Sequence, residues 1–250
     1  MDILLTNDDG PFAPGLPALR RALAQMGTVR VVCPARERSG VAHGITYMVP
    51  VRAHAVRLAD GEQATVLTGT PADCVKFALL ELLDAPPDLL VSGPNIGVNV
   101  GQDIFYSGTV AAALEGAFYG LRSVAVSCSR QDAGQMDLAA RQAVRALRAL
   151  PTDGPPGRAY NVNIPALDGD QPDISFTAQS TVFPRGRYSS MQDAHGRTHY
   201  WLDSTAEDDP PPAGSDVEAL RRGAISVTPL WPDLTDRSAL ESMRTGEQGG

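Results

Sequence analysis

Two adjacent carboxylates near the N-terminus carry the strongest chemical signal in the sequence. Asp8 and Asp9 follow the apolar run 2–6 and precede Gly10, so we expect them in a loop at the end of a buried strand. Neighbouring carboxylates repel each other unless a cation neutralises them, and oxygen ligands favour Mg²⁺, Mn²⁺ or Ca²⁺ over zinc or copper. An ordinary Asp-Asp-Gly turn explains the tripeptide equally well. The pair alone does not decide between a turn and a metal site.

Two further loops offer groups that would complete such a site. The polar stretch 35–44 follows one predicted strand, and the Gly/Asn-rich stretch 93–105 follows another. Ligands of open parallel sheets bind outside the carboxyl ends of the strands, so we expect all three loops along one edge. Ser39 and Asn95 would add neutral oxygens to the two Asp charges. One divalent ion would then give an uncharged complex that accepts a phosphate dianion.

A glycine-flanked helix start supplies a candidate phosphate site. In the stretch 106–110, free backbone N–H groups and the positive end of the helix dipole could bind a phosphate. The candidate ligands are Ser107, Gly108 and Thr109, and an ordinary Ser N-cap is the alternative. Asn99, in the Gly/Asn-rich loop, is a further candidate for substrate contact.

The histidines and cysteines give weaker signals. His43 lies four residues after Ser39 and could orient the substrate or exchange protons. His195 and His199 have a spacing that would suit zinc on a helix, but neighbouring glycine and aromatic residues favour a hairpin, with both histidines at a surface or interface. The cysteines are scattered through apolar stretches and are expected as reduced, buried thiols: Cys33, Cys74 and Cys128.

Composition restricts the class of protein and partner. The chain has 250 residues, 43% of them hydrophobic, which suffices for one large core. A net charge of −8 disfavours a nucleic-acid polymer or an acidic membrane as partner. The sequence has no apolar run of membrane-spanning length and no basic leader, so we expect a soluble cytoplasmic protein. It also has no dinucleotide-binding G-x-G-x-x-G after the first strand, no Walker A lysine motif and no G-x-S-x-G.

The order of predicted elements is that of a doubly wound α/β fold, with a three-layer, mostly parallel, Rossmann-like sheet. We expect strands at 2–6, 29–33, 45–58, 63–68, 88–92, 122–128, 160–164, 173–178 and 224–228, with a hairpin around 197–203. We expect helices at 15–26, from a Thr70 N-cap onward, and at 107–119, 136–149 and 216–222. Gly27 is expected to end the first helix with a positive φ.

We predict one domain over residues 1–250. Its core covers about 1–165 and 214–230, and a β-hairpin extension covers about 166–213. The remainder, 231–250, is predicted to be a polar oligomerisation tail whose last dozen residues are frayed.

Eight sequence blocks, in this order and spacing, closely resemble the SurE survival-protein family. They are Ile3–Gly10, Arg38–Gly40, Gly69–Cys74, Ser92–Gly97, Tyr106–Val110, Asn161–Pro165, Gly214–Asp216 and Ser226–Leu230. The resemblance is strong over 1 to about 130, whereas 166–213 is not diagnostic. One departure is Pro94, where we expect an aliphatic residue before Asn95; its ring restricts the backbone and favours extended geometry at Gly93.

The resemblance implies a 5′/3′-nucleotidase, often with some exopolyphosphatase activity, that assembles as a homodimer or homotetramer. It implies a metal held by the residues Asp8, Asp9, Ser39 and Asn95, and a phosphate site at Ser107, Gly108 and Thr109.

The sequence therefore predicts a phosphomonoesterase acting on small nucleoside monophosphates, with one Mg²⁺ or Mn²⁺ per subunit. Asp8 or Asp9 could also accept the proton of the attacking water. A receiver-type signalling domain is one alternative, but it would be about half this length and would need a late lysine, whereas Lys76 is the chain's only lysine. A non-catalytic, metal-dependent nucleotide-binding module is the other, and only turnover distinguishes it.

Overall fold

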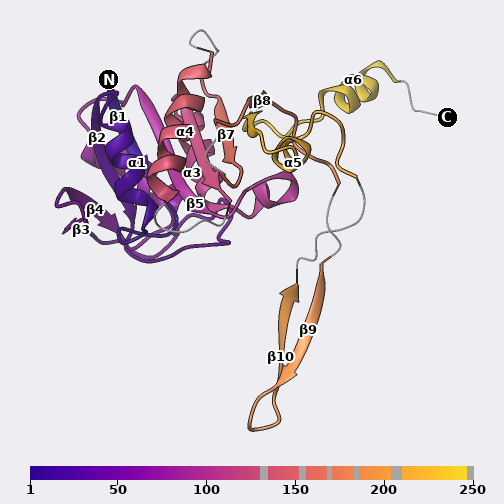
Figure 1. The fold of residues 1–250 in the computed structure, drawn as a ribbon, viewed down its shortest axis with the longest axis horizontal. Coiled ribbons are helices and arrows are strands. Elements are labelled where there is room, and N and C mark those ends of the chain that lie inside the picture. Colours follow the sequence, from indigo (N-terminus) through magenta and orange to yellow (C-terminus); the bar gives the residue numbers. More distant parts are fainter. Residues whose placement is uncertain (130–134, 152–155, 168–170, 183–185, 204–209, 247–250) are drawn as a thin grey trace.

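Apolar runs buried on both faces form the centre of a large sheet. The computed structural model describes residues 1–129, 135–151, 156–167, 171–182, 186–203 and 210–246. In this part of the chain nine strands form one sheet, in the order β3-β4-β2-β1-β5-β6-β7-β11-β8 (Figure 1). They are β1 Asp2–Thr6, β2 Thr28–Pro34, β3 Ala53–Arg57, β4 Gln63–Leu67, β5 Leu89–Ile96, β6 Ser123–Cys128, β7 Ala159–Ile164, β8 Ile174–Phe176 and β11 Ile225–Leu230. The strands from β4 to β7 are parallel, and β3 and β11 run antiparallel to them.

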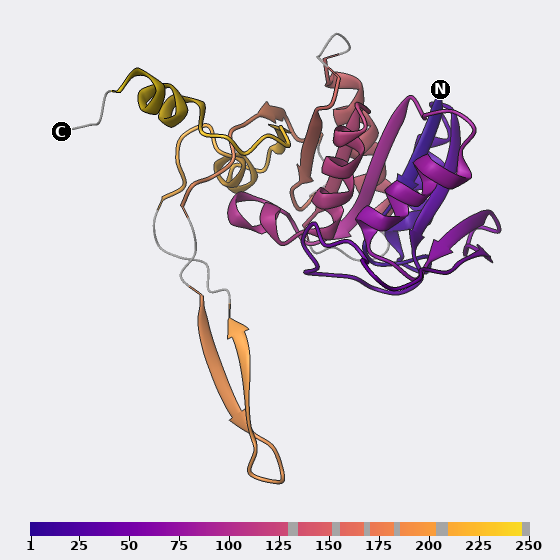
Figure 2. The same cartoon turned by 180° about the vertical axis from the view of Figure 1, so that it is seen from behind.

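Helices cover both faces of this sheet, as Figures 1 and 2 show from opposite sides. The helices are α1 Gly15–Leu23, α2 Pro71–Phe77, α3 Gly108–Phe118, α4 Met136–Ala149, α5 Asp216–Arg221 and α6 Arg237–Thr245, with a π-helical turn η1 Ala78–Leu82 and a 3₁₀ turn η2 Gly101–Phe105. Ile3 and Leu5 share a core with α1 and α4, whereas Leu4 shares one with α2 and α3. This alternation along β1 confirms the predicted three-layer α/β fold.

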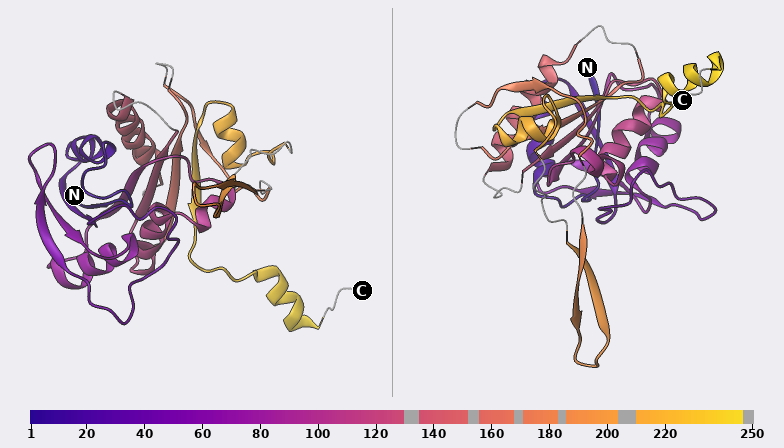
Figure 3. Two further views of the ribbon diagram at one scale, coloured as in Figure 1. Left: turned by 90° about the horizontal axis from the view of Figure 1, so that it is seen from below. Right: turned by 90° about the vertical axis from the view of Figure 1, so that its right-hand side faces the viewer.

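Two segments extend away from the sheet. β9 Arg187–Gln192 and β10 Thr198–Asp203 form the predicted antiparallel hairpin, which projects from the body (Figures 1 and 3). Helix α6 also lies apart from the sheet and has no buried residue. No helix in the described ranges is both long enough and apolar enough to cross a membrane.

Two local predictions in the N-terminal half are wrong. The run 45–58 forms a strand only over Ala53–Arg57, and the helix predicted to end at 26 ends at Leu23. Gly27 has no positive φ. A Cβ there would lie 1.9 Å from the Met1 carbonyl oxygen, so close approach of the N-terminal backbone requires this glycine.

Two other boundaries also differ from the prediction. The strand predicted over 88–92 extends to Ile96, past an irregularity between Ser92 and Asn95 that includes a cis Gly93–Pro94 bond. A Cβ on Gly93 would lie 2.2 Å from the Val126 oxygen, so glycine permits this course. The C-terminal tail is helical rather than frayed over most of its last dozen residues, because Asp236 caps α6 and Gly246 ends it at φ 75°. Residues 247–250 lie outside the described part.

Candidate active site

The carboxyl ends of the parallel strands bring the predicted loops to one edge of the sheet. The loop after β1 is closed by Asn7, whose side chain donates to the Gly10 carbonyl at 2.8 Å and accepts from the Gly10 N–H at 3.1 Å. The Arg38 N–H donates to the Asp8 carbonyl at 2.7 Å. This last contact ties Asp8 to the loop that follows β2.

Asp8 is buried against the start of α3. It is 3% exposed, and Thr109 Oγ1 donates to its Oδ1 at 2.6 Å. Burial raises the pKa of Asp8, and hydrogen bonds from Thr109 offset only part of that rise. A Cβ on Gly108 would lie 3.1 Å from the Asp8 Cβ, so glycine lets the helix begin this close to the carboxylate.

Asp9 is partly buried beside Asp8. Burial, followed by the negative charges of Asp8 and Glu37, raises the pKa of Asp9 to about 6. Within the described residues neither Asp8 nor Asp9 forms an ion pair. Two adjacent, desolvated carboxyl groups without a cationic side chain are what a divalent cation would neutralise.

Ser39 and Asn95 lie in the loop after β2 and at the end of β5, on either side of β1 in the strand order. Ser39 Oγ donates to Glu37 Oε1 at 2.9 Å, and Asn95 Nδ2 donates to the Gly97 carbonyl at 2.8 Å. That orientation leaves Asn95 Oδ1 without a hydrogen bond from the described residues. The donor chemistry fits a hard divalent ion with two carboxylates and neutral oxygens. The described residues hold no cluster of three His, Cys, Asp or Glu side chains suited to metal.

The start of α3 has the predicted Ser N-cap, and its role as a phosphate site stays a prediction. Ser107 is its N-cap, with Oγ accepting from the Val110 N–H at 3.1 Å, and its own N–H donates to the Asp103 carbonyl. The Gly108 N–H has no acceptor among the described residues. Thr109, predicted to contact phosphate, holds Asp8 through its hydroxyl. The helix start can therefore offer an N–H to an anion beside the carboxylate pair.

The His43 side chain lies against the flank of α3. Its Nε2 lies 2.8 Å from Glu115 Oε2, and its ring lies 5.6 Å from the ring of Phe118. Glu115 also accepts from Lys76 Nζ at 2.9 Å. The structure thus places the His43 side chain about two helical turns from the start of α3.

Asn99 lies in a buried polar layer behind the edge. It is 7% exposed, and its Nδ2 donates to Ser127 Oγ at 2.7 Å. Its N–H donates to Asn163 Oδ1 at 2.7 Å, and its carbonyl accepts from Asn161 and Asn163. These hydrogen bonds of Asn99 are all internal, and its contact with substrate stays a prediction.

Sequence analysis gave no role to several residues that support this edge, although they lie in two of the blocks that resemble the family. Asn161 and Asn163 alternate with apolar residues inside the buried strand β7, and that placement was the available signal. Asp216 is fully buried and accepts from the N–H groups of Gly101 and Ser180, both at 2.9 Å. Gly101 and Ser180 lie 115 and 36 residues from Asp216 in sequence, so no local pattern predicts these two contacts.

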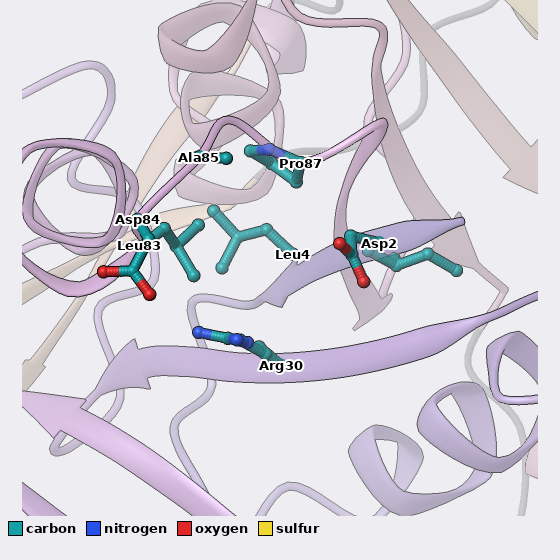
Figure 4. A pocket seen from close by; sticks show the side chains of 8 residues that line it. Asp2, Leu4, Arg30, Leu83, Asp84, Ala85 and Pro87 are labelled. Atoms are coloured by element: carbon teal, nitrogen blue, oxygen red, sulfur yellow. The ribbon is translucent and has the colours of Figure 1, made fainter.

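A separate cleft lies at the opposite edge of the sheet. Its volume is about 200 Å³, and it is lined by Asp2, Ile3, Leu4, Arg30, Leu83, Asp84, Ala85 and Pro87. Figure 4 shows Asp2 and Leu4 of β1 facing it, with Arg30 from β2 on another side. It contains none of the predicted site residues, so it does not compete with the carboxylate pair as the candidate active site.

Comparisons with known proteins agree on one family. The family described as "Survival protein SurE" matches residues 3–185. A "5'-nucleotidase SurE" of Rhodopirellula baltica is 42% identical over 252 residues, covering 98% of each chain, and one of Chloroflexus aggregans is 43% identical, covering 99% of each. The crystal structure of the SurE protein from Aquifex aeolicus matches with a TM-score of 0.81 and 35% identity, covering 99% of this chain and all of that one.

Proposed function

The chain belongs to the SurE survival protein family and is a nucleotidase, and we propose that it hydrolyses nucleoside 5′-monophosphates in a reaction that requires one divalent ion per subunit. We extend the proposal to nucleoside 3′-monophosphates and short polyphosphate. Mg²⁺ and Mn²⁺ are the candidate ions. The observation that carries the metal requirement is the pair of a buried Asp8 and a partly buried Asp9, which forms no ion pair in the described part of the chain.

The proposed ion ligands are Asp8, Asp9, Ser39 and Asn95. When bound, such an ion supplies Lewis-acid polarisation of the phosphoryl oxygens and lowers the pKa of a nearby water. Thr109 keeps Asp8 in place through the 2.6 Å hydrogen bond. Two carboxylate charges balance the ion, so the substrate dianion meets a neutral site rather than a repulsive one.

The start of α3 is the proposed phosphate site. The Gly108 N–H and the positive end of the helix dipole favour the charge that develops on the phosphoryl oxygens. Ser107 shapes this end by capping the helix. Water attacks phosphorus, and the bond from phosphorus to the nucleoside oxygen breaks.

Asp9 is the proposed acceptor of the water's proton, because one oxygen of Asp8 already accepts from Thr109. The leaving nucleoside oxygen takes a proton from solvent. His43 is tied to Glu115, so we assign it no proton transfer.

We also propose that the hairpin and α6 mediate self-association into a dimer or tetramer. Exposed apolar side chains on the hairpin support this proposal, because isolated two-stranded ribbons are marginal in water: Tyr188, Met191, Tyr200, Trp201 and Leu202. Sedimentation showing only monomer at micromolar concentration would refute it.

The test is phosphate release from a panel of nucleoside 5′- and 3′-monophosphates and tripolyphosphate. Each reaction is run with Mn²⁺, with Mg²⁺ and with excess chelator. We expect metal-dependent release that is strongest with 5′-esters. Equal release in chelator would refute the metal requirement, and no release with any nucleotide would refute the activity.

A further inference from the structure

Glu115 is a buried carboxylate in the middle of α3 that the proposed reaction does not use. Its side chain is 6% exposed and contacts two basic groups, His43 Nε2 at 2.8 Å and Lys76 Nζ at 2.9 Å. Burial alone would raise the pKa of Glu115, but hydrogen bonds from these two partners outweigh it and hold the pKa below its ordinary value. An ionised carboxylate only accepts, so His43 Nε2 is the donor.

The two partners of Glu115 belong to different parts of the site architecture. Lys76 is on α2, whose first turn is independently fixed by the Thr70–Asp73 capping box. His43 is in residues 35–47, the segment that carries Ser39, which we call the Ser39 loop. The Glu115 carboxylate therefore connects two segments. One is α2, which its capping box already stabilises, and the other is the Ser39 loop, which has no regular secondary structure.

The Ser39 loop has a turn that needs anchoring. Ala42 has a φ of 55°, a left-handed conformation that costs a non-glycine residue about 1 kcal/mol. The Ala42 N–H donates to the Tyr106 carbonyl at 3.0 Å, and the next residue, His43, contacts Glu115. Both anchors come from α3 and the turn that leads into it, the same element that presents Gly108 and Thr109 to the carboxylate pair.

Other contacts fix the loop on either side of His43, and one of them is adjacent to it: the Gly44 carbonyl accepts from Thr70 Oγ1 at 2.7 Å. The Arg38 N–H contacts Asp8 on the side of β2. Thr46 donates to Asp73 at 2.5 Å from its hydroxyl and at 3.0 Å from its N–H. His43 provides the ionisable contact between them, and its partner is buried.

We propose that Glu115 is a positioning residue, which acts through His43 to hold the Ser39 loop so that Ser39 faces the same ion as Asp8. This role rests on the proposed function, because it takes Ser39 as an ion ligand. Glu115 lies about two helical turns from the start of α3 and takes no part in the bond changes. Supporting groups of this kind orient ligands without touching the ion.

Lys76 supplies a matched control. It contacts the same carboxylate at nearly the same distance as His43 but belongs to α2. Lys76→Met removes one charge partner of Glu115 and leaves the His43 contact. Glu115→Gln instead removes the carboxylate that contacts His43, and His43→Gln removes the imidazole of the same contact.

The experiment measures the full-length variants in three ways. Amide hydrogen exchange of residues 38–46 is followed without metal, Mn²⁺ affinity is titrated without substrate, and kcat and KM are measured across Mn²⁺ concentrations. For Glu115→Gln and His43→Gln we expect about tenfold faster exchange and about tenfold weaker Mn²⁺ binding. Saturating Mn²⁺ should restore most of the lost kcat. Lys76→Met should stay within about twofold of wild type in all three measurements.

Three results would overturn the positioning role. They are wild-type exchange and Mn²⁺ affinity in Glu115→Gln, an equal loss in Lys76→Met, and a kcat deficit that saturating Mn²⁺ does not reduce. If Glu115→Gln fails to fold, His43→Gln tests the positioning role, because His43 is 31% exposed and its replacement should not prevent folding. Its two substrate-free measurements, loop exchange and Mn²⁺ affinity, do not depend on any contact between His43 and substrate. Absence of Mn²⁺ binding in the wild type would instead refute the proposed function itself.

Discussion

The strand-end edge and the projecting hairpin each lack a partner, but of different kinds: the edge lacks a positive charge, and the hairpin lacks a surface to cover its apolar side chains. At the edge, Asn7 is fully buried and Asp8 is 3% exposed, yet the Asp8–Asp9 pair has no cationic side chain to neutralise it within the described residues. On the hairpin, Tyr200 and Leu202 are 67% and 65% exposed and have no core to cover them. A buried charge is stabilised by an ion of opposite charge, whereas an exposed apolar surface is stabilised by contact with another protein surface. The contrast predicts that changes at the edge affect chemistry and that changes on the hairpin affect assembly.

The largest effect is expected at Asp9. Asp9→Asn removes one of two ion-neutralising charges and the proposed proton acceptor, so kcat/KM for a nucleoside 5′-monophosphate should fall roughly 10³-fold. The thermal midpoint of the metal-free protein should not fall. The control is Glu37→Gln, which removes the other nearby negative charge but keeps a side-chain oxygen that can accept from Ser39 Oγ, so it should cost far less. Retention of a tenth of the activity by Asp9→Asn would contradict the assignment.

The next effect concerns the polar layer behind the edge. Asn163→Ala leaves the buried Asn99 N–H without its acceptor and opens a small cavity, so the free energy of unfolding should fall by about 2–3 kcal/mol. Urea denaturation measures this loss. Ser226→Ala is the control, because Ser226 pairs with Asn163 across β11 and β7 and its buried hydroxyl has no hydrogen-bond partner among the described residues. Equal losses in the two variants would mean that the Asn99 contacts are not specifically stabilising.

A smaller effect is expected from pH on the metal-free protein. The pKa of Asp9 is raised to about 6 in the folded protein, mainly by burial, so folding favours its protonated form. That contribution is fully present below the ordinary pKa near 3.8 and is lost as pH rises through about 6. From pH 5 to pH 7.5 the ionisation of Asp9 should therefore lower the free energy of unfolding by about 1 kcal/mol or less, once the shift is discounted for the partial exposure of Asp9. Thermal unfolding in chelator should show this slope in wild type and a flatter one in Asp9→Asn; parallel slopes would contradict it.

The smallest effect on folding is expected on the hairpin. Tyr200→Ser combined with Leu202→Ser changes two exposed side chains on one face of β10, so chain stability should change by less than about 0.5 kcal/mol per site. The assembly should nevertheless dissociate, as measured by sedimentation. Leu80→Ser, which alters a 60% exposed residue on η1, should leave assembly unchanged. Unaltered assembly in the double variant would remove the hairpin from the interface.

Local sequence patterns predicted the helix starts and the first strand, because interactions between neighbouring residues determine these features. The Thr70 capping box and the Ser107 N-cap each depend on residues three positions apart, and the structure has both. The two-sided burial of β1 likewise follows from its apolar run. Each of these features needs only neighbouring residues.

Such patterns could not predict contacts between residues that lie far apart in the sequence. The Glu115–His43 contact joins residues 72 apart, and the Asn99–Asn163 contact joins residues 64 apart. The Gly/Asn-rich loop predicts ligand binding for Asn99, whereas in the described part of the structure Asn99 forms hydrogen bonds with Ser127, Asn161 and Asn163. The Asp8–Asp9 pair could be proposed as a metal site from sequence, but its burial and lack of a cationic partner required the fold.

Calorimetric titration of the metal-free protein with Mn²⁺, without substrate, tests the proposed metal site most directly. The edge should bind one Mn²⁺ per chain. Asp8→Asn, Asp9→Asn and Asn95→Ala should each weaken that binding at least about tenfold, whereas Asp84→Asn in the opposite cleft should not. Failure of the wild type to bind Mn²⁺, or unchanged affinity in Asp9→Asn, would contradict the claim that the carboxylate pair is a metal site.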